Sequence, residues 1–188
     1  MSRLDRRRLA VATLALACLL AGCGALSGGS DGVDGADGRY NVTVVAVIDG
    51  DTVDVEYGNG TVERVRLLGV DTPEVHVEVD PAEYEGVPDT DAGRQCLRAA
   101  GENASDAVRD RIAGERLTLK LDPVSDTRGG YGRLLGYLYA DGENVNEWLV
   151  RTGHARLYDS EFTRLDAFAA AEQTAREAER GLWRCRGS

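Results

Sequence analysis

The chain reads VIDGDTVDV over residues 47–55 and RLLGVDTPE over residues 66–74. Side chains alternate between the two faces of a strand, so Asp51 falls on the same face as the two valines that follow it in the first segment. A carboxylate on a core-facing side requires a cation. Asp71 and Glu74 end the second segment, and the Asn-Gly pair between the segments predicts a hairpin that joins them. We therefore expect the carboxylates of both segments to converge.

A third segment, YGRLLGYLYADG over residues 131–142, is followed by VNEWLVRTG over residues 145–153. The three segments, in this order, closely resemble the staphylococcal nuclease family, and the resemblance extends over about residues 40–183. It implies a five-stranded OB-fold barrel, mainly β, with about three packed α-helices. Alternation and turn signals predict strands over residues 40–48, 51–57, 61–69, 115–121 and 131–140, and helices over 102–113, 145–152 and 160–180.

Roughly 25 residues separate Glu74 from the first predicted helix, and many of them are acidic. This segment either gates a cleft or holds a second cation, or it is a solvated acidic surface; the sequence leaves these alternatives open. Asn144 and Gly153 are expected to cap the two ends of the middle helix.

Acidic residues clearly outnumber basic ones in this chain. The 188 residues include 32 acidic and 22 basic side chains, for a net charge of -10, and Lys120 is the single lysine. An acidic, lysine-poor chain is typical of a protein from a halophilic, archaeal source. At ~1 M ionic strength the Debye length is about 3 Å, so long-range repulsion of a polyanion is screened. The acid excess therefore does not exclude a nucleic-acid substrate.

The N-terminus has the pattern of an export signal. Four arginines precede an apolar run, and residues 20–23 read LAGC, which is typical of a lipoprotein cleavage site. We expect residues 1–22 to be removed and Cys23 to carry lipid, in preference to a transmembrane anchor, because the run is short for a membrane span. Residues 23–39 then form a flexible Gly, Asp and Ser tether, and residues 40–185 the folded domain. A twin-arginine signal is one of two open subtypes.

Two cysteines, Cys96 and Cys185, fall within the predicted domain. In an exported protein they form a disulfide or remain two buried thiols, and both alternatives stay open. No spacing of Cys or His residues indicates zinc.

The resemblance also implies roles for individual residues. The metal is Ca²⁺, held by Asp51, Asp71 and the backbone carbonyl of Thr72, while Asp49 reaches it at most through water. Glu74 orients or deprotonates the attacking water. Arg66 and Arg133 grip the phosphate, because the planar guanidinium fork matches it.

Three further residues are candidates for substrate contact. Tyr131 and Tyr158 suit stacking on a base or contact with a phosphate, although tyrosines at such junctions also serve as core residues. The loop before Tyr131 lacks the lysine found in the best-known family member, and we expect Arg128 to replace it.

These features predict an exported, monomeric lipoprotein, anchored to the outer face of the cell membrane, that hydrolyses DNA and RNA. The resemblance implies that it does so with calcium and leaves 3'-phosphates. Two other classes remain. An inactive OB-fold module binds nucleic acid or protein without cleaving it, and a calcium-stabilised adhesion or solute-binding lipoprotein needs neither predicted phosphate-binding arginine.

Overall fold

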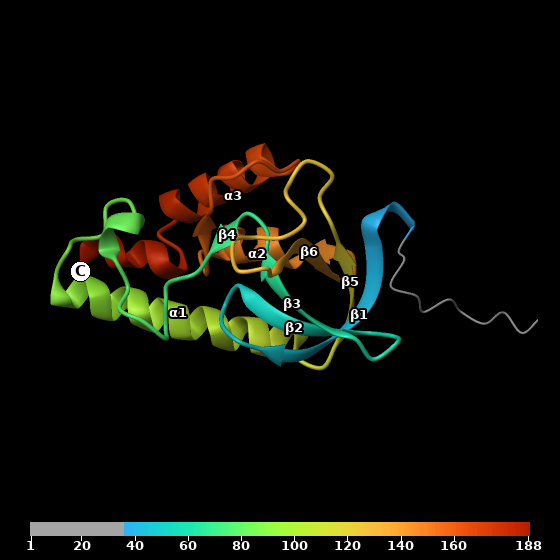
Figure 1. Ribbon diagram of the computed structural model, residues 1–188. Coiled ribbons are helices and arrows are strands. Elements are labelled where there is room, and N and C mark those ends of the chain that lie inside the picture. The colour runs from blue at the N-terminus through green and yellow to red at the C-terminus, as the bar shows by residue number, and fades with distance from the viewer. Residues whose placement is uncertain (1–35) are drawn as a thin grey trace, which may run out of the picture. The chain divides into compact units, whose positions relative to one another are not determined.

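The computed structural model describes residues 36–188 (Figure 1). The predicted export signal, Cys23 and most of the tether lie outside the described residues. No helix within residues 36–188 is long and apolar enough to cross a membrane.

Five strands form a closed barrel. They are β1 (Arg39–Val47), β2 (Thr52–Tyr57), β3 (Val62–Leu67), β5 (Arg116–Lys120) and β6 (Leu134–Ala140). Neighbours in the order β3-β2-β1-β5-β6 pair antiparallel, and a parallel pairing of β3 with β6 closes the circle. The expected barrel is confirmed. Two short additions flank it: β7 (Glu143–Asn144) extends β6, and β4 (Val70–Asp71) pairs with β8 (Arg156–Leu157).

Alternation within β2 explains how the barrel fills. Val53, Val55 and Tyr57 are buried, whereas Asp54 faces outward and pairs with Arg64, the residue directly opposite on β3, at 2.7 Å. The predicted hairpin is present, with the side chain of the turn asparagine accepting a hydrogen bond from a backbone N–H two residues later. This local pattern sets the register that carries Asp51 to the end of the barrel.

Three α-helices pack around the barrel: α1 (Asp91–Ile112), α2 (Val145–Thr152) and α3 (Leu165–Glu177). The caps expected for α2 are both present, because Asn144 accepts a hydrogen bond from the Glu147 backbone N–H and Gly153 adopts a left-handed conformation. Asn146, fully buried on α2, donates to the carbonyls of Leu68 and Gly136 and so joins this helix to the residue that follows β3 and to β6.

The first helix begins earlier than predicted. It starts at Asp91 instead of residue 102, because the Thr90 hydroxyl caps it by accepting from the Gly93 N–H at 3.0 Å. Two glycines weaken the local helix signal. Packing requires one of them: a Cβ on Gly101 would lie 2.2 Å from the carbonyl oxygen of Pro73. The acidic segment after Glu74 is therefore shorter than expected and contains a single turn, η2 (Pro81–Glu83).

Two other element boundaries differ. The strand expected from residue 131 begins at Leu134, because Gly132 adopts a positive φ and ends a tight turn before it. The last helix is shorter than residues 160–180, and its C-terminal part is followed by a 3₁₀ helix, η3 (Gly181–Gly187).

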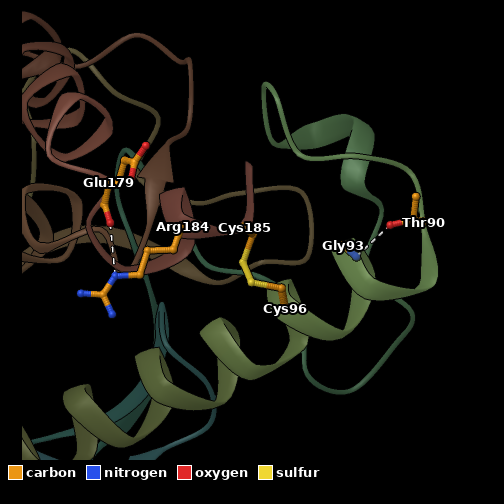
Figure 2. The surroundings of a disulfide bond; sticks show 6 residues. All are labelled: Thr90, Gly93, Cys96, Glu179, Arg184 and Cys185. Carbon is orange, nitrogen blue, oxygen red and sulfur yellow. Dashed lines mark hydrogen bonds between the residues drawn. A yellow bond between two sulfur atoms is a disulfide. The ribbon is translucent and has the colours of Figure 1, made fainter. Parts of the chain in front are cut away.

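A second, smaller core lies outside the barrel. It contains Leu97 from α1, Trp183 from η3 and Tyr84 from the segment after Glu74. A disulfide between Cys96 and Cys185 joins α1 to η3 beside this core (Figure 2). The C-terminal end of the chain thus holds the first half of α1, together with the segment that follows Glu74.

Candidate active site

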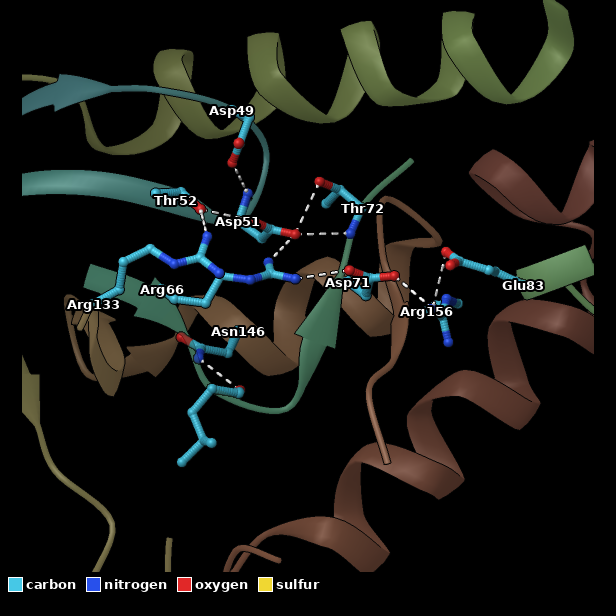
Figure 3. Close-up of polar contacts among 11 residues, drawn as sticks. Asp49, Asp51, Thr52, Arg66, Asp71, Thr72, Glu83, Arg133, Asn146 and Arg156 are labelled. Atoms are coloured by element: carbon cyan, nitrogen blue, oxygen red, sulfur yellow. Dashed lines mark hydrogen bonds and ion pairs between the residues drawn. The ribbon is translucent and has the colours of Figure 1, made fainter. Parts of the chain in front are cut away.

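Asp51 is the centre of a buried polar network at the start of β2 (Figure 3). Its side chain is 8% exposed. One carboxylate oxygen accepts from the Thr72 backbone N–H at 3.0 Å and from the Thr72 hydroxyl at 3.2 Å. The other accepts from the Thr52 hydroxyl at 3.0 Å. The Asp49 side chain lies beside this network and accepts a hydrogen bond from the Asp51 backbone N–H.

Arg66 joins the two predicted metal-ligand aspartates. It extends from β3, and its guanidinium forms ion pairs with Asp51 and with Asp71, the latter at 2.7 Å between Nη2 and Oδ1. The second oxygen of Asp71 contacts Arg156 Nη2, also at 2.7 Å. The predicted convergence of the carboxylates from the two segments is present at this point.

Glu74 stands next to this network but is exposed and forms no ion pair or hydrogen bond with any residue in 36–188. Partial removal from water raises the pKa of Glu74 above its usual range, the negative charges of Asp49 and Asp71 raise it further, and Arg66 opposes the shift. A carboxylate with free oxygens and a raised pKa is suited to accept a proton from water.

A cleft of about 580 Å³ opens beside Arg66. Arg133 lines it, and its Nη1 lies 3.5 Å from the Thr52 hydroxyl, so both predicted phosphate-binding arginines face the same region. Tyr131 and Tyr158 line the cleft as well, with 90% and 51% of their surface exposed. The guanidinium of Arg133 lies 5.5 Å from the centre of the Tyr131 ring. Neither tyrosine is a core residue, which leaves both rings accessible to a base.

Arg128 lies elsewhere. Its two terminal nitrogens pair with both oxygens of Glu63 at 2.8 and 3.0 Å, and it also donates to the Gly132 carbonyl. A phosphate contact by this arginine would require it to leave Glu63.

Comparisons with known proteins identify the family of this chain. Residues 64–185 match the family described as staphylococcal nuclease homologues. The chain belongs to this family.

Individual relatives carry nuclease names. The endonuclease YncB of Bacillus subtilis is 36% identical over 146 residues, which cover 76% of this chain and 61% of that protein. The thermonuclease of Staphylococcus hyicus is 28% identical over 142 residues, covering 74% and 73%. An uncharacterised protein of Methanocaldococcus jannaschii is 38% identical over 152 residues, covering 77% and 72%. The chain thus spans less than two thirds of YncB.

Two buried carboxylates of this family member, Asp51 and Asp71, meet at the positive charge of the Arg66 guanidinium. Carboxylate and carbonyl oxygens are the ligands that calcium prefers. Within residues 36–188, no three Asp, Glu, His or Cys side chains are grouped closely enough to hold a metal by themselves. Asp51, Asp71 and the backbone carbonyl of Thr72 are the groups that would hold calcium according to the family resemblance.

Sequence reasoning missed Arg156. It lies on β8 opposite Asp71, contacts Glu83 at 3.4 Å, and stacks 5.3 Å from the ring centre of Tyr84. A two-residue strand has no periodicity to reveal it, so only the pairing of β4 with β8 identifies this arginine as part of the site.

Proposed function

We propose that this nuclease-family domain is a calcium-dependent endonuclease that hydrolyses DNA and RNA with little sequence preference and leaves 3'-phosphates. The observation that carries the proposal is the meeting of two buried carboxylates and an unpaired glutamate at Arg66, with Arg133 lining the same cleft.

Each residue has a role in this reaction. Hydrolysis adds negative charge to a phosphorus already surrounded by anionic oxygens, so the site must supply positive charge and an aimed water. Asp51, Asp71 and Thr72 would hold calcium, which would supply part of that charge. Arg133 is free to pair with a phosphate oxygen, and Arg66 reaches the phosphate once its guanidinium turns from the aspartates. Glu74 takes the proton of the attacking water, whose oxygen bonds to phosphorus as the bond from phosphorus to the 5'-oxygen breaks. The 5'-oxygen leaves with a proton taken from solvent, and the phosphate stays on the 3'-oxygen.

The direct test is cleavage of single-stranded DNA and RNA by the purified domain in high salt, with calcium and then with excess chelator. We expect endonucleolytic products with calcium and none with chelator. A folded sample that binds the strand without cutting it would support the inactive OB-fold alternative.

Glu74→Gln gives a sharper test of the mechanism. We expect substrate binding to persist and the rate to fall by ~10²-fold to 10⁴-fold, because that is the usual contribution of a general base. Glu102→Gln, at an exposed position on α1, is the matched control and should behave as the parent does. Near-normal turnover by Glu74→Gln would remove this residue from the mechanism.

We also propose that the enzyme is exported and held at the outer face of the membrane by lipid on Cys23, and that it works in concentrated salt. Support comes from the LAGC motif after a basic start and from the acid excess. In concentrated salt, repulsion of the substrate by the acidic surface is screened, while contacts inside the site persist.

A further inference from the structure

A second groove crosses the barrel, apart from the candidate active site. It lies over β1, β5 and β6 and has a volume of about 540 Å³. Its polar lining includes Arg39, Asn41, Arg116, Thr118, Lys120 and Tyr139. The proposed reaction uses none of these residues.

The groove concentrates cations that lack a partner. Most arginines in residues 36–188 pair with a carboxylate or donate to a backbone carbonyl. Within that part of the chain, only Arg39, Arg116, Lys120 and Arg133 do neither. Arg133 is the cleft arginine assigned to phosphate, and the other three line this groove together with one acid, Asp141. In a chain of net charge -10, free cations gathered in one place indicate an anionic ligand.

Strand register gives the spacing of these cations. Arg39 on β1 lies directly opposite Lys120 on β5, and Arg116 lies opposite Thr43. Four residues of strand separate the two positions along β1, which corresponds to about 13 Å. Between them, Thr118 is paired with Tyr139 of β6, so a half-buried aromatic ring lies among the charges. A row of cations with an interposed tyrosine suits a nucleic-acid strand, because the phosphates meet the charges and a base stacks on the ring.

The groove is also close to the cleft along the chain. Lys120 at the end of β5 is four residues from Val124, which lines the cleft. Four residues span at most about 14 Å, so one continuous strand of nucleic acid can occupy both places.

We propose that this groove binds the backbone of a single-stranded nucleic acid whose scissile bond lies in the candidate active site. The inference rests on the proposed nuclease function and extends it. Binding in the groove makes the enzyme favour long single strands over oligonucleotides that are too short to reach beyond the cleft.

The test compares the triple variant Arg39→Gln, Arg116→Gln, Lys120→Gln with a charge-matched control, Arg98→Gln, Arg109→Gln, Arg180→Gln. Binding of a 20-nucleotide DNA is measured in a Glu74→Gln background by fluorescence anisotropy over a range of salt. Each lost phosphate contact lowers the salt slope by ~0.7 for a single strand. We expect the groove variant to lower the slope by about 2 and to weaken binding by roughly tenfold or more, with little change in the control.

Cleavage of a trinucleotide, measured with Glu74 intact, separates the two proposals and serves as a check on folding. We expect the parent and the groove variant to cleave it equally. If the parent cleaves it and the groove variant binds the 20-mer as tightly as the parent, the groove proposal is wrong and the nuclease proposal stands. Equal losses of DNA binding in the groove variant and the control would mean that the loss comes from the change in net charge and not from the groove. A loss of binding to anionic phosphatidylglycerol vesicles, with DNA binding unchanged, would assign the groove to a membrane instead.

Discussion

At the scale of single residues, the orientation of Asp71 depends on two arginines, one on each carboxylate oxygen. Arg66 holds Oδ1 and Arg156 holds Oδ2, each at 2.7 Å. Arg156 is in turn held by Glu83 and by the ring of Tyr84, a buried side chain of the second core. Burial raises the pKa of Tyr84, and the charge of Asp71 adds to that shift, so the phenol stays neutral beside the pair. Arg156 therefore transmits the packing of that core to a predicted calcium ligand.

We predict that Arg156→Gln weakens calcium binding about tenfold, the lower range for residues that orient a metal ligand. Removing the positive charge of Arg156 would by itself strengthen calcium binding, because that charge repels the ion. A weaker calcium affinity of the variant would therefore come from the lost orientation of Asp71. Calcium titration by calorimetry without substrate is the measurement. Arg64→Gln, exposed and paired with Asp54, is the control. Unchanged or tighter calcium binding by Arg156→Gln would contradict an orienting role.

At the scale of elements, Asp122 fastens the loop between β5 and β6, which forms one wall of the cleft. Its carboxylate accepts hydrogen bonds from the Thr163 backbone N–H at 3.0 Å, the Tyr137 hydroxyl at 2.7 Å and the Val124 N–H at 2.9 Å. Burial opposes ionisation of Asp122, but these hydrogen bonds, together with one from the Thr163 hydroxyl, outweigh burial and lower the pKa of Asp122 to about 2. The loop, β6 and the segment before α3 therefore meet at one ionised carboxylate.

Asp122→Asn should destabilise the fold by about 2 kcal/mol at neutral pH, the free energy that corresponds to a pKa lowered from 3.8 to about 2. Because the folded pKa lies below the unfolded one, this contribution is fully present above about pH 4 and is lost as pH falls toward 2. Urea unfolding at several pH values measures it. Asp126 is exposed in the same loop, so Asp126→Asn is the control and should be as stable as the parent. Equal stability of Asp122→Asn and the parent at pH 7 would refute the prediction.

The disulfide acts on whole elements too, since it joins α1 to η3 across 89 residues. Replacing both cysteines by alanine should lower the free energy of unfolding by on the order of 4 kcal/mol in the chain-entropy model. The disulfide lies in the second core and not in the candidate active site, so the variant should still cleave nucleic acid at 25 °C. Urea unfolding and an activity assay on the same sample test both statements. A double variant as stable as the parent would show that packing around Trp183 suffices to hold the two elements.

At the scale of the whole molecule, the proposed place of action depends on Cys23. We predict that Cys23→Ser releases active nuclease into the medium or leaves unprocessed precursor, whereas the parent fractionates with membranes. A single acyl chain binds membranes only marginally, so stable anchoring requires two chains or an equivalent lipid, and the net charge of -10 opposes attraction to an anionic surface. Immunoblots of membrane and soluble fractions provide the measurement. A processed Cys23→Ser protein that stays fully with membranes would locate the anchor elsewhere.

Local chemistry accounts for what the sequence determined by itself. Alternation and the Asn-Gly turn were enough to predict the hairpin and the meeting of Asp51 with Asp71, because strand period and turn preference act over a few residues. The five-stranded barrel was expected from the family resemblance of the three segments. The caps of α2 at Asn144 and Gly153 follow from the same short-range rules.

Contacts between distant segments decided the rest. The first half of α1 contains two glycines, which disfavour a helix. It is stabilised by packing against η3 and by the disulfide, and helix propensity includes neither of these contacts. Arg156 reaches Asp71 only because β4 pairs with β8, and Arg128 pairs with Glu63, 65 residues away, instead of lining the cleft. The basic groove exists only because β1 lies beside β5. Such pairings depend on how the barrel closes, and closure is a property of the folded chain as a whole.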